Sequence, residues 1–453
     1  MPTQLRLLRR GYRAAAAAAA VAASKAGARR KVLDGTPAAL GFRMPAEWEP
    51  HDQCWIGWPD AQGFWRDAAA PAQKAFANVV DAISRFEPVT VCCNATQYAR
   101  VVHLMEHKSN VRVVEMSACL VWLRDLGPSV RILLSVLWRK SLYSLELALL
   151  THYLFYHQFV VREGDTRLRR EIAGVDWQYN AYGGYNGLFG PEDHQLNRRK
   201  GHEEHITEDN LVARKVLELE RIPRFETNFV LEGGSIHVDG EGTCITTEQC
   251  LCHGNRNPHM SKDEIENQLK THLGVSKVIW LPKGLYGDEM ISGHVDNICC
   301  FTGPSTVLLS WIDDKSDPQY EHSAAAFDVL SNTTDAKGRK LDIIKIHVPG
   351  PLYMTEEVAQ PFLGSVALGQ QRLAGSYVNF YIANGGVVAP AFGDKWDEEA
   401  RKILEKVFPK HEVVMVEGGR EIVLGGGNIH CATQQQPAVC PHPSDADTME
   451  GQG

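Results

Sequence analysis

The chain contains 453 residues, of which 44% are hydrophobic and 23% are charged, and its net charge is −8 at neutral pH. The length allows one large domain or two to three smaller ones, and the composition is typical of a soluble globular protein. The acidic balance argues against nucleic acid and anionic lipid as partners and favours small cations.

Residues 1–32 form a leader whose composition differs from the rest of the chain. The leader contains eight Lys and Arg residues, no Asp or Glu, and an alanine run from Ala14 to Ala20. Organelle transit peptides are rich in arginine and poor in acids, so the leader is either a transit peptide or a disordered extension. We expect a cytoplasmic protein, or a plastid protein if the leader is a transit peptide.

The helical and strand patterns alternate along the chain. Four amphipathic stretches are each followed by a β-branched, apolar run, which predicts helices before strands. The helix–strand pairs are 70–86 with 89–93, 95–107 with 111–116, 262–273 with 275–281, and 397–408 with 411–417. Apolar strand pairs with glycine clusters lie between them, at 229–239, 293–301, 381–390 and 422–431. A recurring strand–strand–helix–strand unit predicts a repeated α/β architecture.

The most apolar segment, residues 132–156, is the one candidate membrane span. Arg139, Lys140, Glu146 and His152 interrupt it. Charged side chains are costly at the centre of a bilayer, so we expect no transmembrane helix.

Cysteine usage points to a reducing compartment. The 11 cysteines include no C-x-x-C pair, and a disulfide framework is not expected in a chain of this length. We therefore expect most cysteines to be small buried hydrophobic residues.

Charged residues occur beside the predicted turns. In VWLRDLGP (121–128), Trp122 and Arg124 are expected on one strand face and Asp125 on the other, before a Gly-Pro turn. The alternative interpretation is a structural Arg–Asp ion pair. In LEGGS (231–235), Glu232 stands at a predicted strand end before two glycines, where a β-bulge is the alternative.

GHVDN (293–297) places an imidazole and a carboxylate two residues apart. On a strand, His294 and Asp296 point to the same face, where they can act as an acid–base and a cation holder. They can equally form a surface pair. A metal-dependent hydrolase using His294, Asp296 and His430 is a further alternative, although no ligand pair stands at the helical spacing of H-E-x-x-H.

Cys431 follows three glycines, an asparagine and a histidine in LGGGNIHC (424–431). Together with an imidazole and three carboxylates, this thiol suits attack on an electrophilic carbon that carries positive charge. Carboxylates match the donors of a planar guanidinium, whereas attack on an amide carbonyl calls for an oxyanion hole. We expect the thiol on an exposed turn at a strand end, activated by His⁺ or by the cationic substrate.

The ordered motifs resemble those of agmatine deiminases, in particular the plant-type enzyme. They are residues 44–59, 122–128, 231–244, 293–297, 377–390 and 425–431. The resemblance covers about residues 33–437 apart from 130–210. It implies a five-bladed α/β propeller of ββαβ repeats with the site in a central channel. It also implies hydrolysis of agmatine to N-carbamoylputrescine and ammonia without metal or organic cofactor, and a homodimer.

The resemblance also assigns roles to matching residues. Cys431 is the expected nucleophile, forming a thiouronium, and His294 the expected proton shuttle. Asp125 and Asp296 are expected to clamp the guanidinium, and Glu232 to orient and charge His294. Trp122, Gly427 and Asn428 complete the expected substrate-binding set.

The chain also departs from the family pattern. Cys119 and Leu120 replace an Asn-Asp pair, Ile291 and Ser292 replace Thr-Asn, and two inserts interrupt the catalytic domain, at 131–158 and 187–208. We expect the first insert either to pack outside the domain as a loose helix or to remain poorly ordered, and residues 438–453 to form a disordered tail. The departures leave two alternatives open. One is an impaired paralogue that binds agmatine or partner subunits, and the other is a deiminase of free or peptidyl arginine.

Overall fold

The computed structural model describes residues 32–60, 65–118, 121–135, 169–182, 208–354 and 372–438. The leader up to residue 31, Cys119, Leu120 and the tail after residue 438 lie outside these ranges. So do residues 136–158 of the first predicted insert and 187–207 of the second. In the described part of the chain, no helix is long and apolar enough to cross a membrane.

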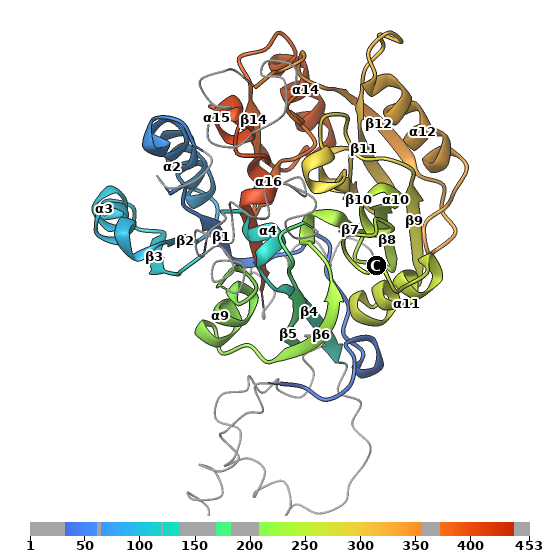
Figure 1. The fold of residues 1–453 in the computed structure, drawn as a ribbon, viewed down its shortest axis with the longest axis horizontal. Helices are drawn as coiled ribbons and strands as arrows, with labels where there is room; N and C mark the ends of the chain where they lie inside the picture. The colour runs from blue at the N-terminus through green and yellow to red at the C-terminus, as the bar shows by residue number, and fades with distance from the viewer. Residues whose placement is uncertain are drawn as a thin grey trace, which may run out of the picture.

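The strands of the described residues form five small sheets. The sheets follow one another around the molecule, with the short helices α4 (Leu123–Leu126) and α16 (Ile429–Ala432) between them (Figure 1). The first sheet has the order β16 (Thr433–Pro437), β1 (His51–Gly57), β2 (Val89–Cys93), β3 (Val111–Glu115). The second contains β4 (Ser129–Ser135), β5 (Arg169–Gln178) and β6 (Arg224–Val230), and the third β7 (Ile236–Val238), β8 (Thr243–Thr247) and β9 (Lys277–Leu281). The fourth contains β10 (Cys299–Gly303), β11 (Thr306–Trp311) and β12 (Asp342–His347), and the fifth β13 (Tyr381–Ala383), β14 (Gly386–Ala391) and β15 (Glu412–Glu417).

Every sheet repeats one pattern of pairing. The first two strands are antiparallel and the next pair is parallel, as in β10–β11 followed by β11–β12. Parallel neighbours require a crossover connection, and the longer helices occupy these connections. They are α2 (Ala70–Ser84), α9 (Val212–Leu219), α11 (Lys262–Leu273), α12 (Gln319–Ser331) and α14 (Asp397–Val407), with α3 (Ala95–Met105) joining β2 to β3. The predicted strand–strand–helix–strand unit is therefore present.

The C-terminal strand completes the first sheet. β16 pairs antiparallel with β1, with Trp55 opposite Gln434. The two ends of the catalytic domain are thus held in one sheet, which places the residues just before β16 beside those that follow β1 and β2. Cys431 lies in that position, two residues before β16 begins.

The cores lie between the sheets and their helices. On α2, Phe76, Val79, Val80 and Ile83 are buried at helical spacing against the first sheet. The helix α11 begins with a capping box, in which Ser261 and Glu264 bond to each other's backbone N–H groups. Eight of the nine described cysteines are buried, and all nine are free thiols. This confirms the prediction that most cysteines are small buried residues.

Three local predictions are wrong, two about segments expected to be strands and one about the exposure of Cys431. Trp122–Asp125 was predicted as strand, but residues 123–126 form α4, because Leu123 and Leu126 bury together at helical spacing. His294 and Asp296 were placed on a strand, but 295–297 form a 3-10 turn, η5 (Val295–Asn297), after Gly293 at φ +74°. Cys431 is next to the start of β16, as expected, but it lies in α16 and is only 2% exposed, so it is not on an exposed turn.

The boundary of the first predicted insert also changes. Residues 131–135 continue β4 and pair with Arg169–Ala173 of β5. The first five residues of the 131–158 segment therefore belong to the second sheet, and any excursion begins after Ser135.

Candidate active site

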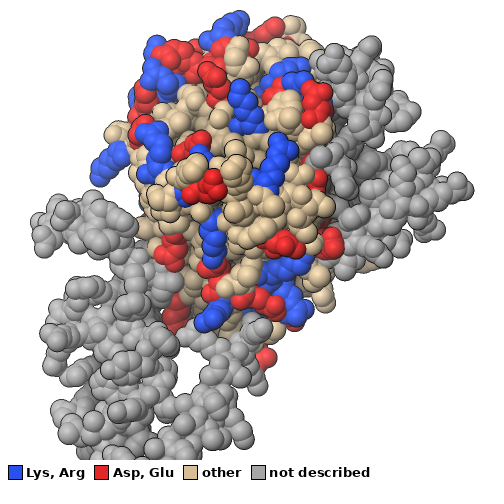
Figure 2. All heavy atoms as spheres, turned by 90° about the vertical axis from the view of Figure 1, so that its left-hand side faces the viewer, with Lys and Arg blue, Asp and Glu red and all other residues tan. Residues whose placement is uncertain are grey.

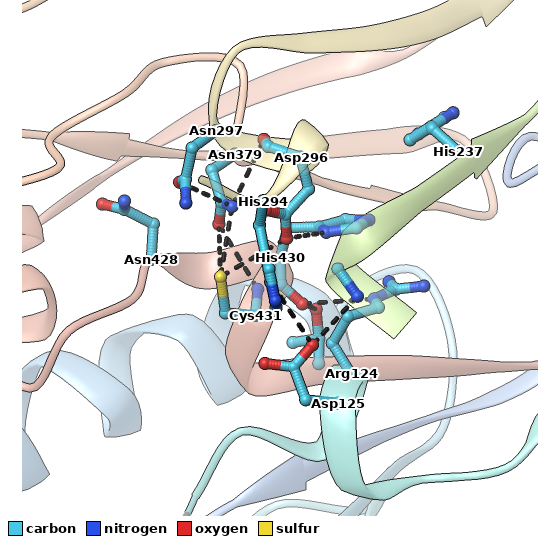
Figure 3. A network of polar contacts seen from close by, with 12 residues as sticks. Arg124, Asp125, His237, His294, Asp296, Asn297, Asn379, Asn428, His430 and Cys431 are labelled. Carbon is cyan, nitrogen blue, oxygen red and sulfur yellow. Dashed lines mark hydrogen bonds and ion pairs between the residues drawn. The ribbon is translucent and has the colours of Figure 1, made fainter. Parts of the chain in front are cut away.

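Four short elements meet in the interior of the molecule: α4, α16, η5 and the 3-10 turn η3 (Gly233–Ser235). The five residues predicted to carry the chemistry lie on them or directly before them: Asp125 on α4, Glu232 before η3, His294 before η5, Asp296 on η5 and Cys431 on α16. None of the five is more than 4% exposed. Figure 3 shows Cys431, His294, Asp296 and Asp125 gathered at one place.

The thiol of Cys431 lies between an amide and a carboxylate. Nδ2 of Asn379 donates to Sγ at 3.2 Å, and Sγ lies 3.4 Å from Oδ2 of Asp296. Burial, followed by the charges of Asp296 and Asp125, raises the pKa of Cys431 well above its usual value. Without a bound cation the residue is therefore a neutral thiol. Of the two expected activators, the structure favours the cationic substrate.

Asp296 is held from behind by His430. Nδ1 of His430 lies 2.9 Å from Oδ2 of Asp296, and Nε2 lies 2.9 Å from Oε1 of Glu47. Burial opposes charge on each group, but the contacts among them lower the pKa of Asp296 and of Glu47 and raise that of His430. Asp296 and Glu47 are therefore ionised carboxylates on either side of the His430 imidazolium, and Figure 3 shows His430 beside Asp296.

His294 lies between two carboxylates without a close hydrogen bond to either. Its Nδ1 is 3.8 Å from Oδ1 of Asp125, and its Nε2 is 4.0 Å from Oε2 of Glu232. Its backbone N–H donates to Oδ2 of Asp288 at 3.0 Å, which fixes the main chain of the turn. The ring of Tyr182 packs edge-on at a centroid distance of 5.9 Å.

Glu232 makes its shortest contact with Arg256 and not with His294. Nε of Arg256 lies 2.9 Å from Oε2 of Glu232, and both side chains are fully buried. Arg256 also donates to Oγ of Ser292 at 2.9 Å and to the carbonyl of Ile291 at 2.9 Å. Ser292 has a φ of +62°, a conformation that asparagine adopts more readily, so the departure at this position carries backbone strain.

Asp125 is oriented by two donors. The hydroxyl of Tyr182 donates to Oδ2 at 2.9 Å, and the backbone N–H of Gly234 donates to Oδ1 at 2.9 Å. Burial raises the pKa of Asp125, His294 lowers it and Asp296 raises it, and the net direction is upward. A cation placed between Asp125 and Asp296 relieves the repulsion between them.

Two glycines permit this close packing. A Cβ atom on Gly234 would lie 2.7 Å from Nδ1 of His294, 2.8 Å from Oδ2 of Asp296 and 3.0 Å from Oδ1 of Asp125. A Cβ on Gly427 would lie 2.9 Å from the ring of Trp122 and 3.0 Å from Cβ of Cys431. The glycines before Cys431 thus make room for the protein's own Trp122, in addition to any role toward substrate.

The remaining predicted substrate-binding residue, Asn428, is completely buried. Its Nδ2 donates to the carbonyl of Ala374 at 2.9 Å, while its Oδ1 has no hydrogen-bond partner among the described residues. One end of this amide is therefore fixed to the scaffold, and its contact with substrate stays a prediction.

Two groups of buried side chains have the spacing of metal ligands: Glu47 with His237 and His430, and Glu232 with Cys250 and His294. In each group a buried arginine already lies 2.9 Å from the carboxylate, Arg124 on Glu47 and Arg256 on Glu232. Such an arginine supplies the positive charge that a metal ion would bring. The hydrolase alternative with His294, Asp296 and His430 is not favoured either, because His430 is occupied by carboxylates at both ring nitrogens.

Three buried polar atoms of the site lack a hydrogen-bond partner among the described residues. Among the described residues, Oδ1 of Asp296 and both ring nitrogens of His294 are buried without a hydrogen-bond partner. An unpaired buried polar atom is costly unless a ligand satisfies it. A planar group with several N–H donors, placed beside Cys431, can donate to Oδ1 of Asp296 and bring its carbon to the thiol.

Sequence reasoning missed several residues that build this site. They are Glu47, Arg124 as a partner of Glu47, Tyr182, Arg256, Asn379 and His430 in its role behind Asp296. Glu47 and His430 stand inside motifs that had been singled out, at 44–59 and 425–431. The available signal for Glu47 was its place next to Trp48, because an acid within an apolar, aromatic stretch needs a partner if it is buried. Tyr182 and Arg256 carried no such signal, because their partners are distant in sequence.

Comparison with known proteins places this geometry in context. Residues 43–437 match the family described as Porphyromonas-type peptidyl-arginine deiminase. The chain is 53% identical to an agmatine deiminase of Medicago truncatula, covering 90% of this chain and 99% of the relative, and 50% identical to one of Pseudomonas aeruginosa, covering 89% and 97%. The solved structure described as agmatine deiminase of Enterococcus faecalis catalyzing its reaction superimposes with a TM-score of 0.73 at 35% identity, covering 90% of this chain and 100% of that one.

Proposed function

Because the chain belongs to the Porphyromonas-type peptidyl-arginine deiminase family and is related over most of its length to agmatine deiminases, we propose that it hydrolyses agmatine to N-carbamoylputrescine and ammonia. The observation that carries the proposal is the buried thiol of Cys431 at 3.4 Å from Oδ2 of Asp296, whose other oxygen, Oδ1, has no hydrogen-bond partner among the described residues. A nucleophile kept neutral by surrounding carboxylates selects a substrate that brings its own positive charge.

Binding comes first. The guanidinium of agmatine donates to Asp296 and to Asp125, and Trp122 lies against it or against the adjoining methylene groups. The positive charge reverses the field that holds the Cys431 proton, so the pKa of the thiol falls on binding and the proton passes to His294. Thiolate and imidazolium are thus formed only when substrate is present.

The first half-reaction forms the bond between Sγ of Cys431 and the guanidinium carbon, giving a neutral tetrahedral adduct. The imidazolium of His294 then donates its proton to one amino group, the C–N bond breaks, and ammonia leaves. The product on the enzyme is a cationic S-alkylthiouronium, which the two aspartates continue to stabilise.

The second half-reaction uses the same imidazole as a base. His294 takes a proton from water while the oxygen adds to the thiouronium carbon. The C–S bond then breaks, the ureido carbonyl forms, and protons return to the thiol and to ammonia. Overall, guanidinium and water yield a ureido group and ammonium, and no cofactor takes part.

The carboxylates also favour agmatine over arginine. Three buried acids surround the guanidinium site, and Arg256 and Arg124 are already paired with Glu232 and Glu47. These two cations are therefore committed to carboxylates of the protein, whereas agmatine carries a second cation and no carboxylate. This supports agmatine over free arginine as the substrate.

The proposal extends to architecture and assembly. The five sheets with repeated pairing, the first completed by β16, support a five-bladed α/β propeller with the site in its central channel. A homodimer in the cytoplasm, or in the plastid if the leader directs it there, is the expected form. Light scattering on the purified full chain tests the dimer.

The function is tested by incubating the full chain with agmatine, arginine and a peptidyl-arginine, and measuring ammonia and the ureido product for each. We expect turnover of agmatine, with a much higher kcat/KM than for the other two. Release of ammonia from arginine at an equal kcat/KM contradicts the specificity, and no turnover of agmatine by folded protein supports the impaired-paralogue alternative.

A further inference from the structure

A second set of buried ionisable residues lies behind the site and has no part in the reaction as described above. Glu47, Arg124, His237 and His430 are each at most 5% exposed. They come from four separate places in the sequence, and the Glu47–His430 contact spans 383 residues. Burying so many charges requires that each be paired, and the pairing here leads directly to Asp296.

Glu47 accepts from three donors at once. Nη1 of Arg124 lies 2.9 Å from its Oε1, Nε2 of His430 lies 2.9 Å from the same oxygen, and Nε2 of His237 lies 3.4 Å from Oε2. The backbone N–H of Phe301 donates to Nδ1 of His237 at 3.3 Å, so His237 carries its proton on Nε2 and is neutral.

His430 has a different state from His237, because both of its ring nitrogens face carboxylates. Ionised carboxylates only accept hydrogen bonds, so a ring placed 2.9 Å from one at each nitrogen donates from both and is an imidazolium. Glu47, Asp296, Arg124 and the ring of His237, at a centroid distance of 6.0 Å, are the titratable and charged groups that face it. Glu47 and Asp296 raise the pKa of His430, whereas burial and Arg124 oppose this.

The imidazolium determines how Asp296 is presented. Oδ2 of Asp296 accepts a hydrogen bond from Nδ1 of His430 and lies beside the Cys431 thiol, and Oδ1 is left without a partner among the described residues. The carboxylate is therefore fixed in one rotation, with its free oxygen available to substrate. A neutral His430 could not donate to both acids, and one of them would turn or take up a proton.

We propose that Glu47 is a positioning residue for the deimination reaction: backed by Arg124, it holds His430 as a cation, and His430 orients Asp296 as an anion with Oδ1 free for the guanidinium. This inference rests on the proposed function, because it explains how the substrate clamp is kept ionised and oriented. Glu47 touches neither the thiol nor the substrate and acts through His430.

The test compares Glu47→Gln with wild type and with a matched control, Glu87→Gln. Glu87 is a second buried glutamate on a histidine, with Nδ1 of His51 at 3.3 Å and the hydroxyl of Tyr381 at 2.6 Å, and it bonds to none of the site residues. Both substitutions keep shape and remove one buried negative charge, so they share any general loss of stability. Activity is measured per folded molecule, across pH, with agmatine.

We expect Glu47→Gln to lower kcat/KM on the order of 100-fold, while Glu87→Gln leaves kcat/KM of the folded fraction near wild type. A raised pKa means that the cation is present below that pKa and lost above it. Removing Glu47 lowers the pKa of His430, so the alkaline limb of the kcat/KM profile moves to lower pH in Glu47→Gln only. The proposal is overturned if Glu47→Gln has the same kcat/KM as wild type. It is also overturned if both variants lose kcat/KM equally and the alkaline limb of the pH profile moves in neither.

A measurement on the unmutated chain covers the case in which Glu47→Gln does not fold. With ¹⁵N-labelled histidine, one imidazole is expected to keep both ring N–H protons at mildly alkaline pH, in wild type and in Glu87→Gln alike. Absence of any such imidazole overturns the proposal. The spectrum does not depend on turnover, so the two proposals can fail separately. If the wild-type chain does not convert agmatine, the proposed function is refuted, and the spectrum still shows whether His430 is charged.

Discussion

The centre of the molecule and its surface pair the same kinds of charged residues in different surroundings. On the face shown in Figure 2, Lys and Arg side chains alternate with Asp and Glu in open solvent. A surface example is Arg401 on α14, whose Nη2 lies 2.6 Å from Glu398, with side chains 36% and 57% exposed. In the centre, Arg256 and Glu232 form an ion pair with both side chains at 0% exposure.

The difference teaches where charge matters in this fold. Water screens the surface pairs, so each contributes little to stability and losing one is tolerated. In the centre no water replaces a lost partner, and the unpaired charge that remains is costly. The centre therefore depends on each of its members, and the unpartnered atoms of Asp296 and His294 are the places left open for a ligand.

The largest expected effect follows from replacing the nucleophile at the centre of the molecule. Cys431→Ser removes the one sulfur that attacks carbon and should lower kcat for agmatine on the order of 10⁴-fold or more, while folding and binding persist. Steady-state kinetics and agmatine binding by calorimetry check this, with Cys252→Ser on the surface as control. The assignment is falsified if Cys431→Ser keeps near-wild-type kcat.

The next prediction compares the two ion pairs directly. Arg256→Met leaves Glu232 buried and unpaired and should cost about 3–5 kcal/mol of the free energy of unfolding. Arg401→Met on α14 should not change it measurably. Urea denaturation of both variants gives the comparison, and similar losses in the two would contradict the distinction between centre and surface.

The centre is also more tightly packed than the surface at its glycines. Gly234→Ala forces a methyl group against His294, Asp296 and Asp125, and overpacking of this kind should cost about 1–3 kcal/mol and most of the turnover. A Cβ on Gly254 meets nothing within 4 Å, so Gly254→Ala serves as the matched control. Thermal unfolding and kcat/KM are measured for both, and an active, stable Gly234→Ala enzyme would show that the site is looser than described.

The smallest expected effect concerns thiol reactivity in the absence of substrate. Burial and two aspartates raise the pKa of Cys431, so its thiolate fraction is small at neutral pH and keeps growing as pH rises past the usual range of a thiol. Iodoacetamide should therefore label the exposed Cys252 about tenfold faster than Cys431 near neutral pH. Mass spectrometry of the labelled peptides gives both rates, and faster labelling of Cys431 would mean that its thiolate exists before substrate binds.

Much of the site could be predicted from sequence because glycine clusters mark it. Asp125, Glu232, His294, Asp296 and Cys431 all stand within four residues of a glycine. The structure brings all five together. The predicted helices at 262–273 and 70–86 also agree closely with α11 and α2, since their apolar periodicity is regular and one carries a capping box. The short turns were mistaken for strands because three or four residues are too few to show a period.

The sequence by itself determined the alternation of helices and strands, the residue types of the reaction, and the acidic character that favours a cation. Only the tertiary structure decided which charge is paired with which. Glu232 pairs with Arg256 more closely than with His294, and Asp296 pairs with His430, which in turn pairs with Glu47. A sequence can show that a buried charge needs a partner, because desolvation is costly wherever the charge is placed. It cannot name that partner, because residues 383 positions apart become neighbours only when β16 closes against β1.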